Sequence, residues 1–175
     1  MATYWTLQEE VVWNEAVKIG YLEGKQEYAM YPAEYIWMMA QMKLRLENYN
    51  DEYPIWLWIK KPDMRSASHF KSYTRCVRLT IDLEEENVLV SDFEDWHSVL
   101  NNGFNADNEQ EYDDFYEGKL KITKEESWER IFELDRIQDP LWSGVRDWLQ
   151  GVTGRIDINK VKKVEHFVSR KQVEF

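Results

Sequence analysis

The sequence is poor in the residues that build most recognisable chemical sites. Its 175 residues include one cysteine and three histidines. A single cysteine, Cys76, excludes both an intramolecular disulfide and a cluster of thiolate metal ligands. The histidines His69, His97 and His166 are far apart in the sequence, and a metal site would need them to converge with a carboxylate. We therefore predict that the chain binds no metal.

Short catalytic and targeting motifs are missing too. The chain has no glycine-rich phosphate loop, no His-Glu-x-x-His pair and no Gly-x-Ser-x-Gly elbow. No window reaches the roughly 18 apolar residues that a membrane-spanning helix needs. The opening Met-Ala-Thr-Tyr-Trp lacks the basic and apolar regions of a secretion signal. We therefore expect a cytoplasmic protein with no membrane contact.

Negative charge dominates the middle of the chain. The net charge is −11, and residues 82–135 hold 18 acidic residues against 4 basic ones. Residues 1–81 carry ten of each sign, and residues 136–175 carry 5 acidic and 8 basic residues. The segment 82–135 would repel a phosphate backbone, so we expect no direct binding to nucleic acid. It could attract a basic protein partner, although solvated loops and helix faces explain the same charge.

Hydrophobic periodicity predicts a single compact α+β domain over residues 1–175. Apolar and alternating segments predict a mixed or antiparallel central sheet, in which 75–83 and 88–90 form a hairpin. Three helices should flank this sheet, and the acidic segment of about 101–120 reads as an exposed loop. The predicted strands are 3–7, 55–59, 75–83, 88–90, 149–153 and 161–168.

Helix boundaries are marked by familiar capping residues. Thr6 with Glu9, and Thr123 with Glu126, each fit a capping box at the start of a helix. The first helix should end at Gly20, and the helix from Thr123 should reach about residue 134. A further helix, 32–46, begins at a proline and carries a buried stripe. That stripe consists of Tyr35, Met38, Met39, Met42 and Leu46.

The most suggestive site lies where the strand 88–90 passes into a helical segment. Asp92 ends the strand, and His97 and Asn101 follow on the helix. Polar side chains at such a junction often build sites in α/β proteins. His97 beside Asp92 and Asp95 could act as a general base or as a hydrogen-bonded capping group.

Further polar candidates stand in or beside other predicted strands. Arg65 could hold a phosphate or carboxylate with its planar guanidinium, or form a salt bridge to Asp63 or Asp92. Gln8, Arg78 and Gln150 could each line a cleft or cap a neighbouring element. The residues alone leave these alternatives open.

Four motifs together resemble an uncharacterised family of bacterial and phage proteins, catalogued as domain of unknown function 3841. The motifs are Trp-Thr-x-Gln at 5–8, Lys-Pro-Asp-x-Arg at 61–65, Ser-Asp-Phe-x-x-Trp-His-x-Val-Leu-Asn at 91–101 and Ser-Trp-x-x-Ile-Phe at 127–132. The resemblance covers almost the whole chain, and it implies no established activity.

The opening segment is also similar to the start of small ADP-ribosyltransferase folds. This resemblance implies an NAD- or nucleotide-binding domain that acts on a cellular macromolecule. Gln150 stands near the position of the family's catalytic glutamate, and glutamine cannot ionise. In this interpretation Thr6, Gln8 and Gln150 line the pocket and Arg65 holds phosphate. His97 and Asp92 are the remaining catalytic candidates, and Asn101 is a candidate ligand contact.

The alternative interpretation is a non-enzymatic acidic protein. Tyr112, Phe115 and Tyr116 lie among the carboxylates of the segment 82–135. Acidic side chains favour a basic partner, and aromatic anchors supply affinity. A phage-borne inhibitor of a host nucleic-acid-binding factor, which mimics a polyanion, would have these features.

Overall fold

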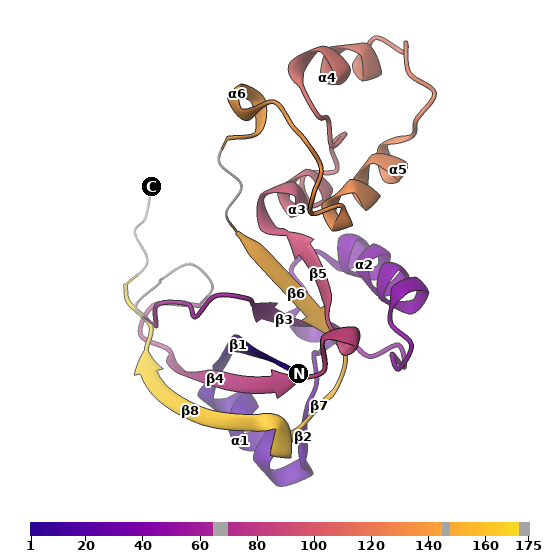
Figure 1. Cartoon of the computed structure of the whole chain (residues 1–175). Coiled ribbons are helices and arrows are strands. Elements are labelled where there is room, and N and C mark those ends of the chain that lie inside the picture. The colour runs from indigo at the N-terminus through magenta and orange to yellow at the C-terminus, as the bar shows by residue number, and fades with distance from the viewer. Residues whose placement is uncertain (65–69, 145–147, 172–175) are drawn as a thin grey trace. The chain divides into compact units, whose positions relative to one another are not determined.

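The structure is a computed structural model that describes residues 1–64, 70–144 and 148–171. The chain forms two compact units, one from residues 1–89 with 151–175 and one from residues 90–150. Strands of unit 1 and helices of unit 2 are labelled in Figure 1. Both unit boundaries fall inside strands, β5 (Leu89–Asp92) and β6 (Leu149–Thr153).

Six strands form the principal sheet in the order β5-β6-β3-β1-β4-β8. Two short strands, β2 and β7, pair antiparallel in a separate ribbon. The remaining bounds are β1 (Ala2–Glu9), β2 (Tyr21–Leu22), β3 (Ile55–Trp58), β4 (Arg75–Leu83), β7 (Ile156–Asp157) and β8 (Val161–Val168).

Strand β4 pairs antiparallel with β1 and with β8. Its register with β1 runs without a break from Leu83 opposite Ala2 to Cys76 opposite Glu9. Because both edges of β4 are occupied, β5 pairs with β6 instead. The predicted hairpin of 75–83 with 88–90 is therefore wrong, although both strands exist.

Unit 1 contains helices α1 (Glu10–Ile19) and α2 (Pro32–Arg45) and the short 3-10 turns η1 (Gln26–Tyr28), η2 (Glu85–Asn87) and η4 (Ile158–Lys160). Gly20 ends α1 in the left-handed conformation, as predicted. The predicted capping box at Thr6 is wrong, because residues 6–9 continue β1. Pairing along the full length of β4 outweighs this local helix signal.

The predicted buried stripe of α2 is confirmed in part, because Tyr35 and Met39 are only half-buried. Met38 and Met42 are fully buried, and Leu46 is nearly so. Tyr35 contacts the indole of Trp56 on β3, with ring centroids 5.7 Å apart. The core also contains the apolar side chains of β4, and Cys76 is buried among them. Burial, with the nearby charges of Glu9 and Glu10, raises the pKa of this thiol to about 11.

An ion pair joins β4 to β8. Arg78 donates from Nε to the Glu165 carboxylate at 2.7 Å and from Nη1 to the Pro62 carbonyl at 2.7 Å. The Arg78 side chain is 9% exposed, and Lys163 lies 2.8 Å from the other Glu165 oxygen. Arg78 therefore ties the segment that follows β3 to the sheet.

Unit 2 is mainly helical. Its helices are α3 (Phe93–Leu100), α4 (Glu109–Tyr116), α5 (Lys124–Trp128) and α6 (Pro140–Ser143), with a 3-10 turn η3 (Glu129–Phe132). The capping box of Thr123 with Glu126 is confirmed, and its helix continues as η3 before ending short of residue 134.

The expected loop of about 101–120 is wrong in part, because it contains α4. Asn108 caps that helix by accepting from the Glu111 backbone N–H at 2.8 Å.

The α+β class with its antiparallel strand pairs is confirmed. Within residues 1–64, 70–144 and 148–171, no helix has the length and apolar character needed to cross a membrane. The assignment of residues 1–175 to a single domain stays a prediction.

Acid should weaken unit 1 through Glu165. Hydrogen bonds from Lys163 and then from Arg78 lower the pKa of Glu165 from 4.5 to about 2. A carboxylate with a lowered folded-state pKa contributes stability above its unfolded pKa, and this contribution is lost as the pH falls through the folded value. The variant Glu165→Gln should therefore lose less stability than the wild type between about pH 4.5 and 2. Urea unfolding at a series of pH values measures this, and equal losses in both proteins would contradict it.

Candidate functional site

Asp92 is buried at the start of α3. Its Oδ1 accepts a hydrogen bond from the Asp95 backbone N–H at 2.9 Å, which makes Asp92 the N-cap of the helix. A carboxylate at this position satisfies an otherwise unpaired N–H and interacts favourably with the helix dipole. The structure thus gives Asp92 a clear structural role.

His97 follows on the same helix, Asn101 follows directly after its last residue, and both are exposed. His97 Nδ1 lies 3.0 Å from the Phe93 carbonyl oxygen, and its ring meets Phe93 edge-on at 4.9 Å. Asn101 is the C-cap, and its backbone N–H donates to the His97 carbonyl at 2.9 Å. Both residues therefore have partners within α3.

Gln150 is buried on β6 and donates to the Ser91 hydroxyl at 3.4 Å, next to Asp92 in the sequence. In unit 1, Thr6 is buried on β1 and accepts from the Gln8 side chain at 2.9 Å. Arg65 lies outside the described residues. The structure thus gathers Asp92, His97, Asn101 and Gln150 in unit 2, whereas Thr6 and Gln8 belong to unit 1.

Unit 2 contains two arginines that the sequence patterns did not single out, Arg136 with a side chain 7% exposed and Arg130 with one 16% exposed. Arg136 lies 3.1 Å from Asp95 on α3 and 3.0 Å from Asp107 in the following loop. The side chains of Arg136 and Asp95 are 7% and 8% exposed. Buried charges need close partners of opposite sign, so this contact holds the loop 101–108 against α3.

Arg130 on η3 makes the second ionic contact. Its guanidinium binds both carboxylate oxygens of Glu111 on α4 and donates to the Asn105 carbonyl at 2.9 Å. Burial alone would raise the pKa of Glu111, but hydrogen bonds from Arg130 and from the Asp107 backbone N–H outweigh it and lower that pKa. A bidentate arginine fixes orientation as well as distance. Arg130 therefore fixes the inward face of α4.

Aromatic contacts complete this inward face. Phe115 of α4 stacks on Phe104 with ring centroids 4.1 Å apart and an interplanar angle of 6°. Arg130 lies over the same Phe104 ring at 5.5 Å. Trp128 of α5 donates its indole N–H to the Gly103 carbonyl at 2.7 Å. The side of α4 that carries Glu111 and Phe115 is thus packed inward, and the Tyr116 hydroxyl adds a contact by accepting from the Phe104 backbone N–H at 3.3 Å.

The outward side of α4 carries alternating acidic and aromatic residues. Glu109, Tyr112, Asp113 and Tyr116 follow the spacing i, i+3, i+4, i+7, so they share one helix face, which we call the α4 stripe. All four residues are exposed. The Glu109 and Asp113 carboxylates have no hydrogen-bond or ion-pair partner among the described residues. By contrast, Glu111 pairs with Arg130, and Asp114 lies near Lys119.

Helix α6 extends the α4 stripe. The Trp142 ring lies 5.4 Å from that of Tyr112, which in turn lies 4.6 Å from Tyr116. Leu141 beside Trp142 is 97% exposed. Asp139 caps α6 by accepting from the Leu141 N–H at 3.0 Å. An aromatic cluster with an exposed leucine and free carboxylates can bind a partner that is both cationic and apolar.

Some features of the sequence predict the helices of this surface, but each spans only a few residues. The spacing of Tyr112, Phe115 and Tyr116 is helical, and Asn108 is a suitable N-cap. Asp139-Pro140 marks the start of α6 and not only a turn. No local pattern links Arg130 and Arg136 to their carboxylates, because the partners are 19 and 41 residues away.

Loss of Arg130 should destabilise unit 2. The variant Arg130→Met leaves Glu111 without its cation, and loss of these half-buried hydrogen bonds between charged groups costs about 2 kcal/mol. Lys119→Met is the matched control, because its ion pairs are exposed and worth less than about 1 kcal/mol. Urea unfolding of the full chain compares the two. Equal, small losses would show that Arg130 does not hold α4.

Comparisons with known proteins support the first resemblance. Residues 3–125 match the family model described as Domain of unknown function (DUF3841). Searches of curated proteins and of solved structures find no significant match. The similarity to ADP-ribosyltransferases, with its nucleotide or NAD ligand, stays a prediction. Because the family model matches well over half of its length, the chain belongs to the DUF3841 family.

Proposed function

We propose that unit 2 is a docking module for a basic protein segment, which it binds through the α4 stripe and the adjoining α6. The observation that carries this proposal is that the inward and outward carboxylates of α4 differ in their ion pairing. The inward carboxylate Glu111 is neutralised by Arg130, whereas the outward carboxylates of Glu109 and Asp113 are free beside exposed rings.

Charge supports a basic partner. Residues 90–150 hold 16 acidic residues against 6 basic ones, whereas the remainder of the chain holds 17 against 16. Unit 2 therefore carries nearly all of the protein's net negative charge. Such a surface speeds the approach of a cationic partner and repels the phosphates of nucleic acid.

Exposed apolar groups support a protein partner over a small cation. Tyr112 and Trp142 are 38% and 39% exposed, and Tyr116 is 55% exposed. Tyrosine and tryptophan are enriched among residues that dominate binding energies at protein interfaces. An arginine side chain can lie flat on such rings and still reach a carboxylate with its N–H groups. The segment we propose therefore combines arginine or lysine with leucine-like side chains.

A defined peptide tests the docking module. The full chain is titrated with acetylated, amidated RLRRLLRRLR, and binding is followed by calorimetry at two salt concentrations. Loss of the anchors in Y112A/W142A should weaken binding at least about tenfold, which corresponds to about 1.4 kcal/mol. E109Q/D113N should weaken binding about threefold and reduce its salt dependence.

A matched control separates the α4 stripe from general charge. E94Q/E125Q removes the same charge from exposed positions of unit 2 outside the α4 stripe and should leave affinity within about twofold. Circular dichroism confirms that each variant is folded. Equal weakening in E94Q/E125Q and E109Q/D113N, or full binding by folded Y112A/W142A, would overturn the proposal.

A further inference from the structure

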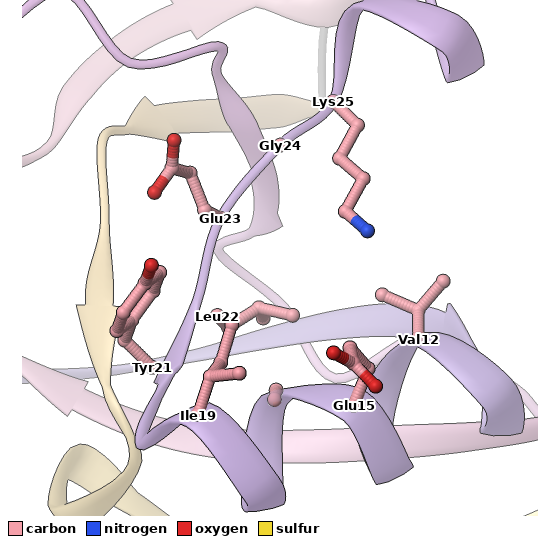
Figure 2. A pocket seen from close by; sticks show the side chains of 9 residues that line it. Val12, Glu15, Ile19, Tyr21, Leu22, Glu23, Gly24 and Lys25 are labelled. Carbon is pink, nitrogen blue, oxygen red and sulfur yellow. The ribbon is translucent and has the colours of Figure 1, made fainter.

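Unit 1 contains a small hollow between α1 and the strand that follows it. Val12, Ala16 and Ile19 contribute one wall from α1, and Leu22 contributes from β2. The hollow measures about 170 Å³ and is open to solvent on one side. Its floor is aliphatic, as Figure 2 shows, and a ligand body made of methylene groups would fit it.

The main chain on the far side of the hollow is fixed by Gly24. This residue forms an isolated β-bridge with Tyr53. A Cβ atom at position 24 would lie 2.7 Å from the carbonyl oxygens of Tyr53 and Pro54, so only glycine permits this approach. Lys25 is the next residue, so the bridge at Gly24 fixes the position of the Lys25 main chain.

Opposite charges face each other across the hollow. Figure 2 shows the Lys25 ammonium group directed into it from one side and the Glu15 carboxylate from α1 on the other. Neither group has a hydrogen-bond or ion-pair partner among the described residues. Glu23 lies nearby but is already engaged by Arg155, at 2.8 Å from Nη2, and Arg155 lies over the Tyr21 ring at 3.8 Å. Glu15 and Lys25 are thus the charged groups of this hollow that remain available to a ligand.

We propose that this hollow binds a small zwitterion with an aliphatic body, its anionic end at Lys25 and its cationic end at Glu15. The volume of about 170 Å³ admits a short chain of methylene groups between the charges. A free ω-amino acid has this chemistry. The site lies within unit 1 and does not depend on the docking module.

The test uses 6-aminohexanoate and its two halves, hexanoate and hexylamine, titrated into the full chain by NMR. The zwitterion should bind at millimolar concentration, at least about fivefold more tightly than either half, because each half leaves one charge of the hollow unpaired. Glu15→Gln and Lys25→Gln should each remove that advantage. Glu27→Gln and Lys18→Gln, exposed neighbours outside the hollow, should change nothing.

Charge reversal makes the test independent of folding defects. Glu15→Lys should turn the preference to adipate, and Lys25→Glu should turn it to 1,6-diaminohexane. The double variant E15K/K25E should restore binding of 6-aminohexanoate in the reverse orientation. If the zwitterion binds no better than its halves, or if the single reversals do not change the preference, the proposal is overturned.

Discussion

The pairing of Arg130 and Arg136 with inward carboxylates is the constraint on which unit 2 depends. This unit has 16 acidic and only 6 basic residues, so self-repulsion opposes its compaction. The two arginines lie where α3, the loop 101–108, η3 and α4 meet, and they bind Asp95, Asp107 and Glu111. Because these two arginines pair with inward carboxylates, Glu109 and Asp113 on the outward face of α4 keep their charge uncompensated. Folding and the proposed docking surface thus follow from one distribution of charge.

Unit 1 relies on hydrophobic burial and strand pairing instead. Its strand β4 is paired on both edges and buried for most of its length, and α2 adds its methionines to the same core. Charges in this unit are nearly balanced, and its buried arginine, Arg78, serves to join β8 and the segment after β3. The hollow beside α1 is lined in part by Gly24, where the absence of a side chain allows two segments of main chain to approach closely.

Local signals predicted those elements whose stabilising contacts are themselves local. The capping box at Thr123, the stop at Gly20 and the α2 stripe needed only nearby residues. The capping-box pattern at Thr6 predicted a helix wrongly, because residues 6–9 pair with strand β4, some 70 residues away in the sequence, and are therefore extended. Helix α4 was predicted as a loop because its acidic composition is typical of an exposed loop. The contact that stabilises it, between Glu111 and Arg130, joins residues 19 positions apart in the sequence. Asp92 and Gln150 were predicted as site residues because their structural hydrogen-bond partners cannot be identified from the sequence. Their hydrogen bonds to Asp95 and Ser91 became visible only in three dimensions.

In the proposed function, the α4 stripe and α6 form the docking surface, and acidic charge elsewhere in the chain does not. An NMR titration of the isotope-labelled full chain with the arginine–leucine peptide tests it most directly. We expect the shifts to concentrate on the amides of residues 109–116 and on the indole signal of Trp142. Shifts of similar size at other acidic segments, such as residues 84–86, with little change at α4, would contradict it.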